Sequence, residues 1–187
     1  TFKYTNYDRY AARVNTSFTP KKWIRLGENL QVTYEKNEGT RTTGEGGPWG
    51  WAYRMVPYIP ARDIGGGFGG NAVGQSGNAT NPLASIYRAK DDYTTAYKIF
   101  GNMFIEIMPI EGLKIRSSYG IDYGNWFNKD ITYRTYESSE NTSITGLGTG
   151  YNYNLTWTWT NTAAYEKTFG QHALKFLVGT EAIKYSG

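Results

Sequence analysis

The side chains that most often carry out acid–base or metal chemistry are sparse in this sequence and do not group. The 187 residues include one histidine, His172, and no cysteine, so thiolate metal sites and disulfides are excluded. Glu106, Asp122 and Glu181 fall on polar strand faces, but no spacing sets two of them at the separation that acid–base catalysis needs. No set of serine, histidine and aspartate can be argued either. We therefore expect no enzyme, no catalytic residue, no metal site and no cofactor.

One stretch matches the glycine spacing of a dinucleotide-binding motif. The tract "GGGFGG" fits the G-x-G-x-x-G spacing through Gly65, Gly67 and Gly70. A dinucleotide site needs a strand before this tract and a helix after it. Here "YIPARDI" precedes it and "NAVGQSGNAT" follows it, and neither segment suits that role. The context favours a flexible loop.

Charge and hydropathy exclude two further classes of protein. The net charge is +4, but lysine and arginine are scattered singly, whereas a nucleic-acid-binding protein gathers them in a patch. We expect no nucleic-acid partner. The mean hydropathy is −0.59, and no run of about 18 apolar residues exists that would form a membrane-spanning helix. Strands of a membrane barrel stay compatible with this value, because their alternating residues average to a polar score.

Six stretches alternate between apolar and polar residues with a period of two, which is the pattern of β-strands. The clearest is "YNYNLTWTWT" at 151–160, with large apolar side chains on one face and small uncharged polar ones on the other. Glu28 interrupts one apolar set, and Phe100 and Phe104 fall on a polar side. The expected strands are residues 8–19, 23–36, 96–108, 113–124, 151–166 and 172–185.

The links between these strands alternate between short and long. Tight turns are expected near residues 20–22, 110–112 and 169–171, whereas the links at 37–95 and 137–150 are long. Bacterial outer-membrane barrels sort their connections in this way, with short turns at the periplasm and long loops outside. The polar faces also carry more charge than a packed soluble core accepts.

These features predict an all-β fold: a segment of a large antiparallel transmembrane β-barrel with three hairpins and long extracellular loops. Single-chain bacterial barrels have at least about eight strands. We therefore expect residues 1–187 to be an incomplete part of one barrel domain, with its apolar face in lipid and its polar face in a wet interior. The side chains expected to face lipid are Ile99, Ile105, Ile115, Ile121, Leu155, Trp157, Leu174 and Phe176.

Four segments in the same order resemble the SusC/RagA family of TonB-linked outer-membrane transporters. They are "YDRYAARVNTSFTPKKWIRLGENLQVTYEKNEG" (7–39), "NPLASIYRAKDDYTT" (81–95), "FGNMFIEIMPIEGLKIRSSYGIDY" (100–123) and "HALKFLVGTEAIKY" (172–185). No one motif is diagnostic, but the ordered set is fairly specific. The resemblance implies that the segment comes from the early barrel, immediately after the plug.

The resemblance also implies a set of partners and a function. The family has a barrel of about 22 strands with an N-terminal plug, a SusD-like surface lipoprotein as cap, and TonB as the energy source. Its cargo is oligosaccharide or peptide, taken up across the bacterial outer membrane. Neither a plug nor a TonB box is found in these 187 residues.

The first long link contains the best candidates for contact with a ligand or partner. Aromatic faces stack on flat ligands, and arginine offers a planar fork of hydrogen-bond donors. The alternative is that these side chains pack the loop against the barrel or its cap, which we favour. We expect residues 46–60 and 81–92 to form part of the docking surface for the cap and the glycine tract at 65–77 to be mobile. The candidate residues are Trp49, Trp51, Tyr53, Arg54 and Tyr58.

Two other functions stay open on the sequence alone. One is a SusC-like barrel that acts as a non-transporting scaffold in an outer-membrane complex, because the physics of its wall would be the same. A soluble carbohydrate-binding β-sandwich would use the tryptophans as a platform, but the charged strand faces and the alternating link lengths argue against it.

Overall fold

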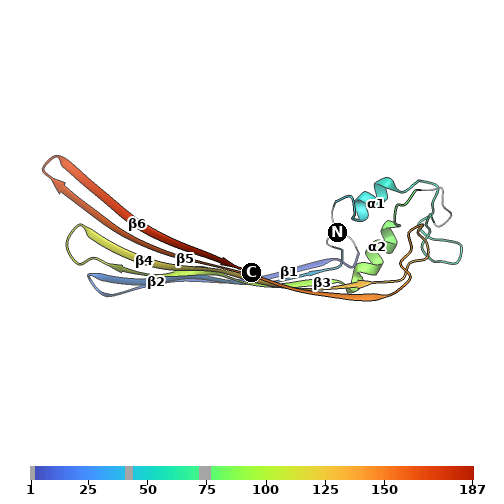
Figure 1. The fold of residues 1–187 in the computed structure, drawn as a ribbon, viewed down its shortest axis with the longest axis horizontal. Coiled ribbons are helices and arrows are strands. Elements are labelled where there is room, and N and C mark those ends of the chain that lie inside the picture. Colours follow the sequence, from blue (N-terminus) through green and yellow to red (C-terminus); the bar gives the residue numbers. More distant parts are fainter. Residues whose placement is uncertain (1–2, 41–43, 72–76) are drawn as a thin grey trace. The chain divides into compact units, whose positions relative to one another are not determined.

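The computed structural model describes residues 3–40, 44–71 and 77–187 and consists mainly of one six-stranded sheet (Figure 1). The strands follow one another across the sheet in chain order, so each is a neighbour of the next. Among the described residues no second sheet packs on this one, which argues against a β-sandwich. The strands are β1 (Asn6–Lys21), β2 (Ile24–Glu38), β3 (Tyr93–Ile107), β4 (Leu113–Thr132), β5 (Gly146–Phe169) and β6 (His172–Ser186).

Three hairpins with short turns build the sheet, as the sequence predicts. β1 and β2 are joined by Lys22 and Trp23, and β5 and β6 by Gly170 and Gln171. Gly170 has a φ of 60° and Gly112, at the end of the β3–β4 turn, has a φ of 83°. These are left-handed conformations that only glycine adopts at little cost.

The two long links also join antiparallel neighbours. Between β2 and β3, the N–H of Met108 donates to the carbonyl of Trp23 at 2.7 Å, while Gly39 donates to Asp92 at 2.9 Å. The start of β2 therefore pairs with the end of β3, and the end of β2 with the start of β3, so the two strands are antiparallel. Between β4 and β5, the N–H of Glu166 donates to the carbonyl of Gly112 at 2.8 Å.

β4 and β5 extend well beyond the residues where the sequence predicts strand. β4 continues through "NWFNKD" to Thr132, and β5 begins at Gly146 rather than near residue 151. Glycines at 146, 148 and 150 lower the intrinsic strand preference of this segment. Pairing with the end of β4 overrides that preference, since a Cβ added at Gly148 would lie 3.7 Å from the carbonyl oxygen of Asp130.

The long link between β2 and β3 contains two helices that the sequence analysis did not predict. They are α1 (Pro48–Arg54) and α2 (Pro82–Arg88), and α2 is followed by a 3₁₀ turn, η1 (Ala89–Asp91). Asn81 caps α2, because its side-chain oxygen accepts from the N–H groups of Leu83 at 2.9 Å and Ala84 at 3.3 Å. In the described residues neither helix is long or apolar enough to cross a membrane.

The chain divides into two compact units. The loop unit comprises Thr1–Arg9, Glu35–Thr95 and Trp126–Tyr151, and it holds both helices. The strand unit comprises Tyr10–Tyr34, Ala96–Asn125 and Asn152–Gly187, and it holds the three hairpin turns.

Close backbone approach, rather than a large apolar core, organises the loop unit. A Cβ at Gly70 would lie 1.9 Å from the carbonyl oxygen of Glu137, and one at Gly69 would lie 2.0 Å from that of Pro60. Asn81 ties the same region together by donating to the carbonyls of Ala61 at 3.0 Å and Gly69 at 2.7 Å. Gly69 and Gly70 of the glycine tract are therefore closely packed, whereas a Cβ at Gly66 would meet open space. The mobility of 65–77 stays a prediction. Residues 72–76 lie outside the described residues.

A buried ion pair fastens α2 to the loop between β4 and β5. The guanidinium of Arg88 forms a fork on the carboxylate of Glu137, with Nη1–Oε1 at 2.5 Å and Nη2–Oε2 at 2.8 Å. Burial raises the pKa of Glu137, but hydrogen bonds from Arg88 and from the N–H of Tyr136 outweigh it. The net pKa is therefore lowered below the usual glutamate value.

We expect acid to loosen this contact before it disturbs the strands. A carboxylate with a lowered pKa stabilises the fold above its unfolded-state pKa of about 4.3, and this contribution is lost as the pH falls through the folded value. Exchange protection of the amides in α2 and in residues 135–142, corrected for the intrinsic pH dependence of amide exchange, should therefore fall on acidification below about pH 4. Glu137→Gln should abolish this pH dependence of the local protection. An unchanged acid response in Glu137→Gln would contradict the assignment.

Candidate functional site: a polar wall backed by an apolar face

Side-chain contacts show that the apolar sets of the six strands form one face of the sheet. In the strand unit, the ring of Tyr34 lies 6.3 Å from that of Tyr10 on β1 and 4.9 Å from that of Tyr97 on β3. Tyr119 of β4 stacks on Trp157 of β5 at 6.0 Å. The β5–β6 register sets Tyr165 opposite Phe176. Side chains alternate along a strand, so these contacts determine which face of the sheet each remaining residue of the strands occupies.

We call this surface the apolar face. It contains all eight residues that the sequence analysis expects to face lipid, and no described residue of the chain covers most of it. Phe18 is 66% exposed, Met103 64% and Phe176 64%. Soluble proteins rarely expose contiguous apolar patches of this kind, so the face requires an apolar environment or a partner. Its residues include Val14, Phe18, Leu26, Val32, Ile99, Met103, Ile105, Ile115, Ile121, Leu155, Trp157, Trp159, Leu174 and Phe176.

Several polar residues share the apolar face, among them Lys184, which the β5–β6 register sets opposite Trp157. Two of their polar groups have hydrogen-bond partners on the same face. Glu28, the residue that breaks the sequence pattern of β2, accepts a hydrogen bond from the hydroxyl of Thr16 at 3.2 Å. The indole N–H of Trp159 donates to the hydroxyl of Ser117 at 3.0 Å. Pairing of this kind lowers the cost of holding polar atoms in apolar surroundings.

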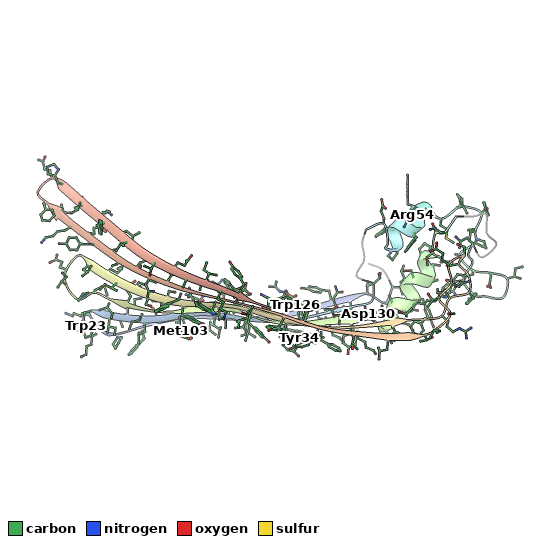
Figure 2. All side chains as sticks on the ribbon, in the orientation of Figure 1. Trp23, Tyr34, Arg54, Met103, Trp126 and Asp130 are labelled. Atoms are coloured by element: carbon green, nitrogen blue, oxygen red, sulfur yellow. The ribbon has the colours of Figure 1, made fainter. Side chains whose placement is uncertain are left out.

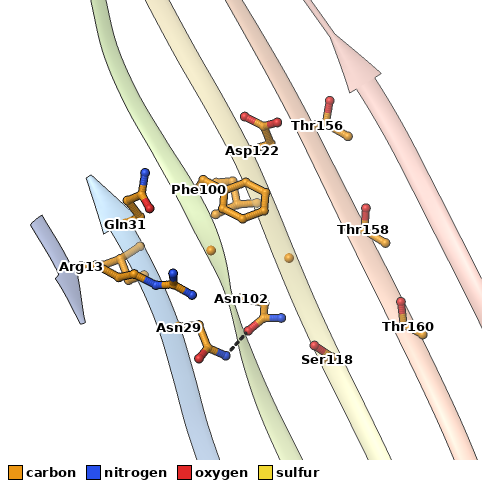
Figure 3. A pocket seen from close by; sticks show the side chains of 14 residues that line it. Arg13, Asn29, Gln31, Phe100, Asn102, Ser118, Asp122, Thr156, Thr158 and Thr160 are labelled. Atoms are coloured by element: carbon orange, nitrogen blue, oxygen red, sulfur yellow. Dashed lines mark hydrogen bonds between the residues drawn. The ribbon is translucent and has the colours of Figure 1, made fainter. Parts of the chain in front are cut away.

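The opposite surface, which we call the polar face, contains a hollow of about 340 Å3 (Figure 3). Asn29 donates to Asn102 across β2 and β3 at 2.9 Å, and Thr160 of β5 donates to Glu181 of β6 at 3.1 Å. Phe100 stands among these polar groups with 62% of its surface exposed. The side chains around the hollow are Arg13, Asn29, Gln31, Phe100, Asn102, Ser118, Asp122, Thr156, Thr158 and Thr160.

This hollow offers hydrogen bonds rather than bond-making chemistry. Neutral amides and hydroxyls dominate its lining, with one guanidinium from Arg13 and one carboxylate from Asp122. Such a surface holds water or a polar ligand against the wall. Asn154, on the same face of β5, has a buried side-chain oxygen for which no hydrogen-bond partner is found among the described residues.

The carboxylates singled out in the sequence are spread over the polar face. Glu106 lies near both Arg116 and Lys114. Lys175 pairs with Glu166 at 2.5 Å, and Glu181 accepts from Thr160. The lone histidine, His172, begins β6 beside the turn, as the sequence predicts.

The aromatic candidates of the first long link divide into two groups. Arg54 lies at the end of α1 (Figure 2). Its guanidinium lies 4.2 Å from the ring centroid of Trp51 and donates to the carbonyl of Glu45, so both residues stabilise the loop itself. In contrast, Trp49 is 66% exposed, Tyr53 92% and Tyr58 72%. Exposed aromatic rings of this kind are enriched at protein interfaces.

Comparison with known proteins was made at the level of sequence and of structure. No protein-family model matches the sequence, and no curated protein matches it. Among solved structures, the chain resembles the RagAB peptide transporter with a TM-score of 0.73 and 22% identity, covering 97% of this chain and 20% of that one. The RagAB peptide importer in its closed-closed and open-open states gives TM-scores of 0.72 and 0.73 at 21% identity, with the same coverage.

At this identity the likeness shows the fold. The chain spans about a fifth of the length of the chains it resembles. Its fold is that of a segment of a large antiparallel β-barrel, and the sheet is open in these residues, with β1 and β6 at its edges.

The two faces make opposite predictions for neighbouring residues of β5. Replacing Trp157 with arginine should cost roughly 2–4 kcal/mol of stability if the apolar face lies at the middle of a bilayer. Thr158→Arg should be mild, because its side chain enters the polar side. The comparison requires the complete protein folded into lipid vesicles, with unfolding followed by urea titration. Equal losses in the two variants would overturn the assigned facing.

Proposed function

We propose that this chain forms part of the wall of an outer-membrane transporter that imports oligosaccharide or peptide nutrients with energy from TonB. The observation that carries the proposal is the pairing of one exposed apolar face with one polar face on a six-stranded sheet. A membrane barrel with a wet interior needs this arrangement. The likeness in fold to the RagAB peptide transporter supports the same function.

In this proposal the apolar face contacts outer-membrane lipid and the polar face lines the interior. Strands that cross a bilayer need about 9–11 residues, and β1–β6 contain 15–24. The outer edges of β1 and β6 would pair with further strands, because unpaired backbone groups in hydrocarbon cost several kcal/mol each. The long links would lie outside the cell and the short turns at the periplasm.

We also propose a SusD-like surface lipoprotein as the partner of the loop unit. Exposed tryptophan and tyrosine rings are the side chains that most often dominate protein interfaces, and Trp49, Tyr53 and Tyr58 meet that description. Their loop is ordered by the contacts of Asn81 and Arg54, so the rings are held in place before a partner binds. Residues 46–60 and 81–92 would form the docking surface.

Removing two rings tests this docking surface. In the complete protein, Trp49→Ala combined with Tyr53→Ala should weaken co-purification of the lipoprotein by about tenfold or more, since hot-spot rings contribute roughly 2 kcal/mol each. The double variant is gentler than deletion of 46–60, which also removes the buried Pro48. Ile64→Ala is the matched control, because Ile64 is fully exposed in the same unit but outside the stretch.

The outcomes separate the alternatives. Full co-purification with lost uptake of cargo would assign the rings to the ligand. If neither changes, the docking assignment is wrong. Normal assembly of the whole complex without any uptake by the wild-type protein would instead favour the non-transporting scaffold.

A further inference from the structure

Phe104 breaks the alternation of β3, and the structure shows what it does on the polar face. The guanidinium carbon of Arg116 lies 3.9 Å from the centroid of its ring, and that of Arg25 lies 5.9 Å away. Both distances fall within the range of cation–π attraction. The ring therefore holds two like-charged groups from β2 and β4 near one another, beside the short turns of their hairpins.

Gly27 makes room for this ring. A Cβ built at Gly27 would lie 2.5 Å from Cζ and 2.6 Å from Cε1 of Phe104, closer than real Cβ contacts. Any side chain at this position would have to displace the ring. Gly27 thus positions Phe104, and Phe104 in turn positions Arg25 and Arg116.

The nearby carboxylate offsets only part of this positive charge. Glu106 is only 5% exposed, and its oxygens lie 3.8 Å from Nζ of Lys114 and 3.7 Å from Nη1 of Arg116. These distances exceed the 2.7–3.2 Å of an N–H···O hydrogen bond. The described residues provide no carboxylate within salt-bridge distance of Arg25. The carboxylate of Glu106 is therefore buried beside two of the three cations, and at these distances it accepts no hydrogen bond from either of them.

The positive charges of this site are more exposed to solvent than its negative charge. The side chains of Lys114 and Arg116 are 53% and 39% exposed, whereas that of Glu106 is 7% exposed. A molecule approaching this part of the polar face therefore meets positive charge and free donors. Guanidinium groups match carboxylates in shape, because two parallel N–H groups fit the two carboxylate oxygens.

We propose that Arg25, Lys114 and Arg116, arranged around Phe104, form a binding site for a soluble carboxylate. This deepens the proposed function, because an imported molecule that bears a carboxylate would be held here against the wall. The hollow around Phe100 is a separate feature, with one cation, one carboxylate and mainly neutral groups. The carboxylate site would therefore select cargo by charge, and the hollow by hydrogen bonding.

Citrate is a suitable probe, measured by titration calorimetry on the complete purified protein at constant ionic strength. Wild-type protein should bind citrate, and Arg25→Gln or Arg116→Gln should weaken binding by about tenfold or more, the loss expected for one charge-assisted hydrogen bond. Gly27→Val should also weaken binding, because it displaces the ring while keeping every charge. Lys175→Gln is the matched control, since it removes an exposed cation of the polar face that pairs with Glu166 on another hairpin, and it should leave binding unchanged.

Three outcomes would overturn the proposal: no binding of citrate by the wild type, equal affinity in all variants, or equal binding of uncharged maltotriose. If an arginine variant fails to fold, Lys114→Gln replaces it, because the side chain of Lys114 is more exposed than that of Arg116. The assay does not depend on transport. Citrate binding without cargo uptake would keep the site and reject the proposed function, and uptake without citrate binding would do the reverse.

Discussion

The whole structure depends on one constraint: the sheet directs large apolar side chains to one side and leaves them uncovered. Alternation along a strand fixes which residues share a face, and antiparallel pairing joins the six sets into one surface. Trp157 and Tyr119 stack within it, and Phe18 and Met103 stand exposed on it. The other face is free to carry arginines, amides and threonines because no apolar core has to form there. A bilayer satisfies both demands together, which is why the proposed function begins from this asymmetry.

The loop unit is ordered in a different way from the sheet. It has few buried apolar side chains among its described residues, chiefly Phe68, Ala79 and Ala84. Its order comes instead from backbone packing at Gly69 and Gly70 and from the polar side chains that bridge its segments. Bonds of this kind fix the geometry of a loop without a large core. Several of its aromatic rings stay exposed to solvent, among them Trp49 and Tyr53.

The features that could be predicted from the sequence follow from the two-residue alternation of the strands and from the proline and glycine residues of the turns. The alternation, the three hairpins and the shared face of Ile99, Trp157 and Phe176 needed no tertiary information. The extension of β5 was not predicted, because the glycines at its start are typical of a loop. Pairing with β4 nevertheless keeps them in the sheet. The helices were missed because each has only seven residues, too few for a periodic signal. "NP" before α2 was the available sign, as asparagine and proline favour the start of a helix.

Phe104 shows why the apparent exceptions in a pattern carry information. By composition it belongs on the apolar face, and only the contacts with Gly27 and Arg116 explain its position. Those contacts join β2, β3 and β4, and no local pattern predicts them. The exposed rings of α1 belong to the same category, because their exposure depends on which other loop residues pack together.

The central claim is that the apolar face lies in hydrocarbon and the polar face in water. Nitroxide labels placed singly at residues 153–160 of β5, in the complete protein reconstituted into lipid bilayers, measure this facing directly through collisions with oxygen and with a water-soluble nickel complex. Oxygen partitions into lipid, so the account predicts high oxygen accessibility at odd positions and high nickel accessibility at even positions. A profile without a period of two, or one with the opposite phase, would contradict it.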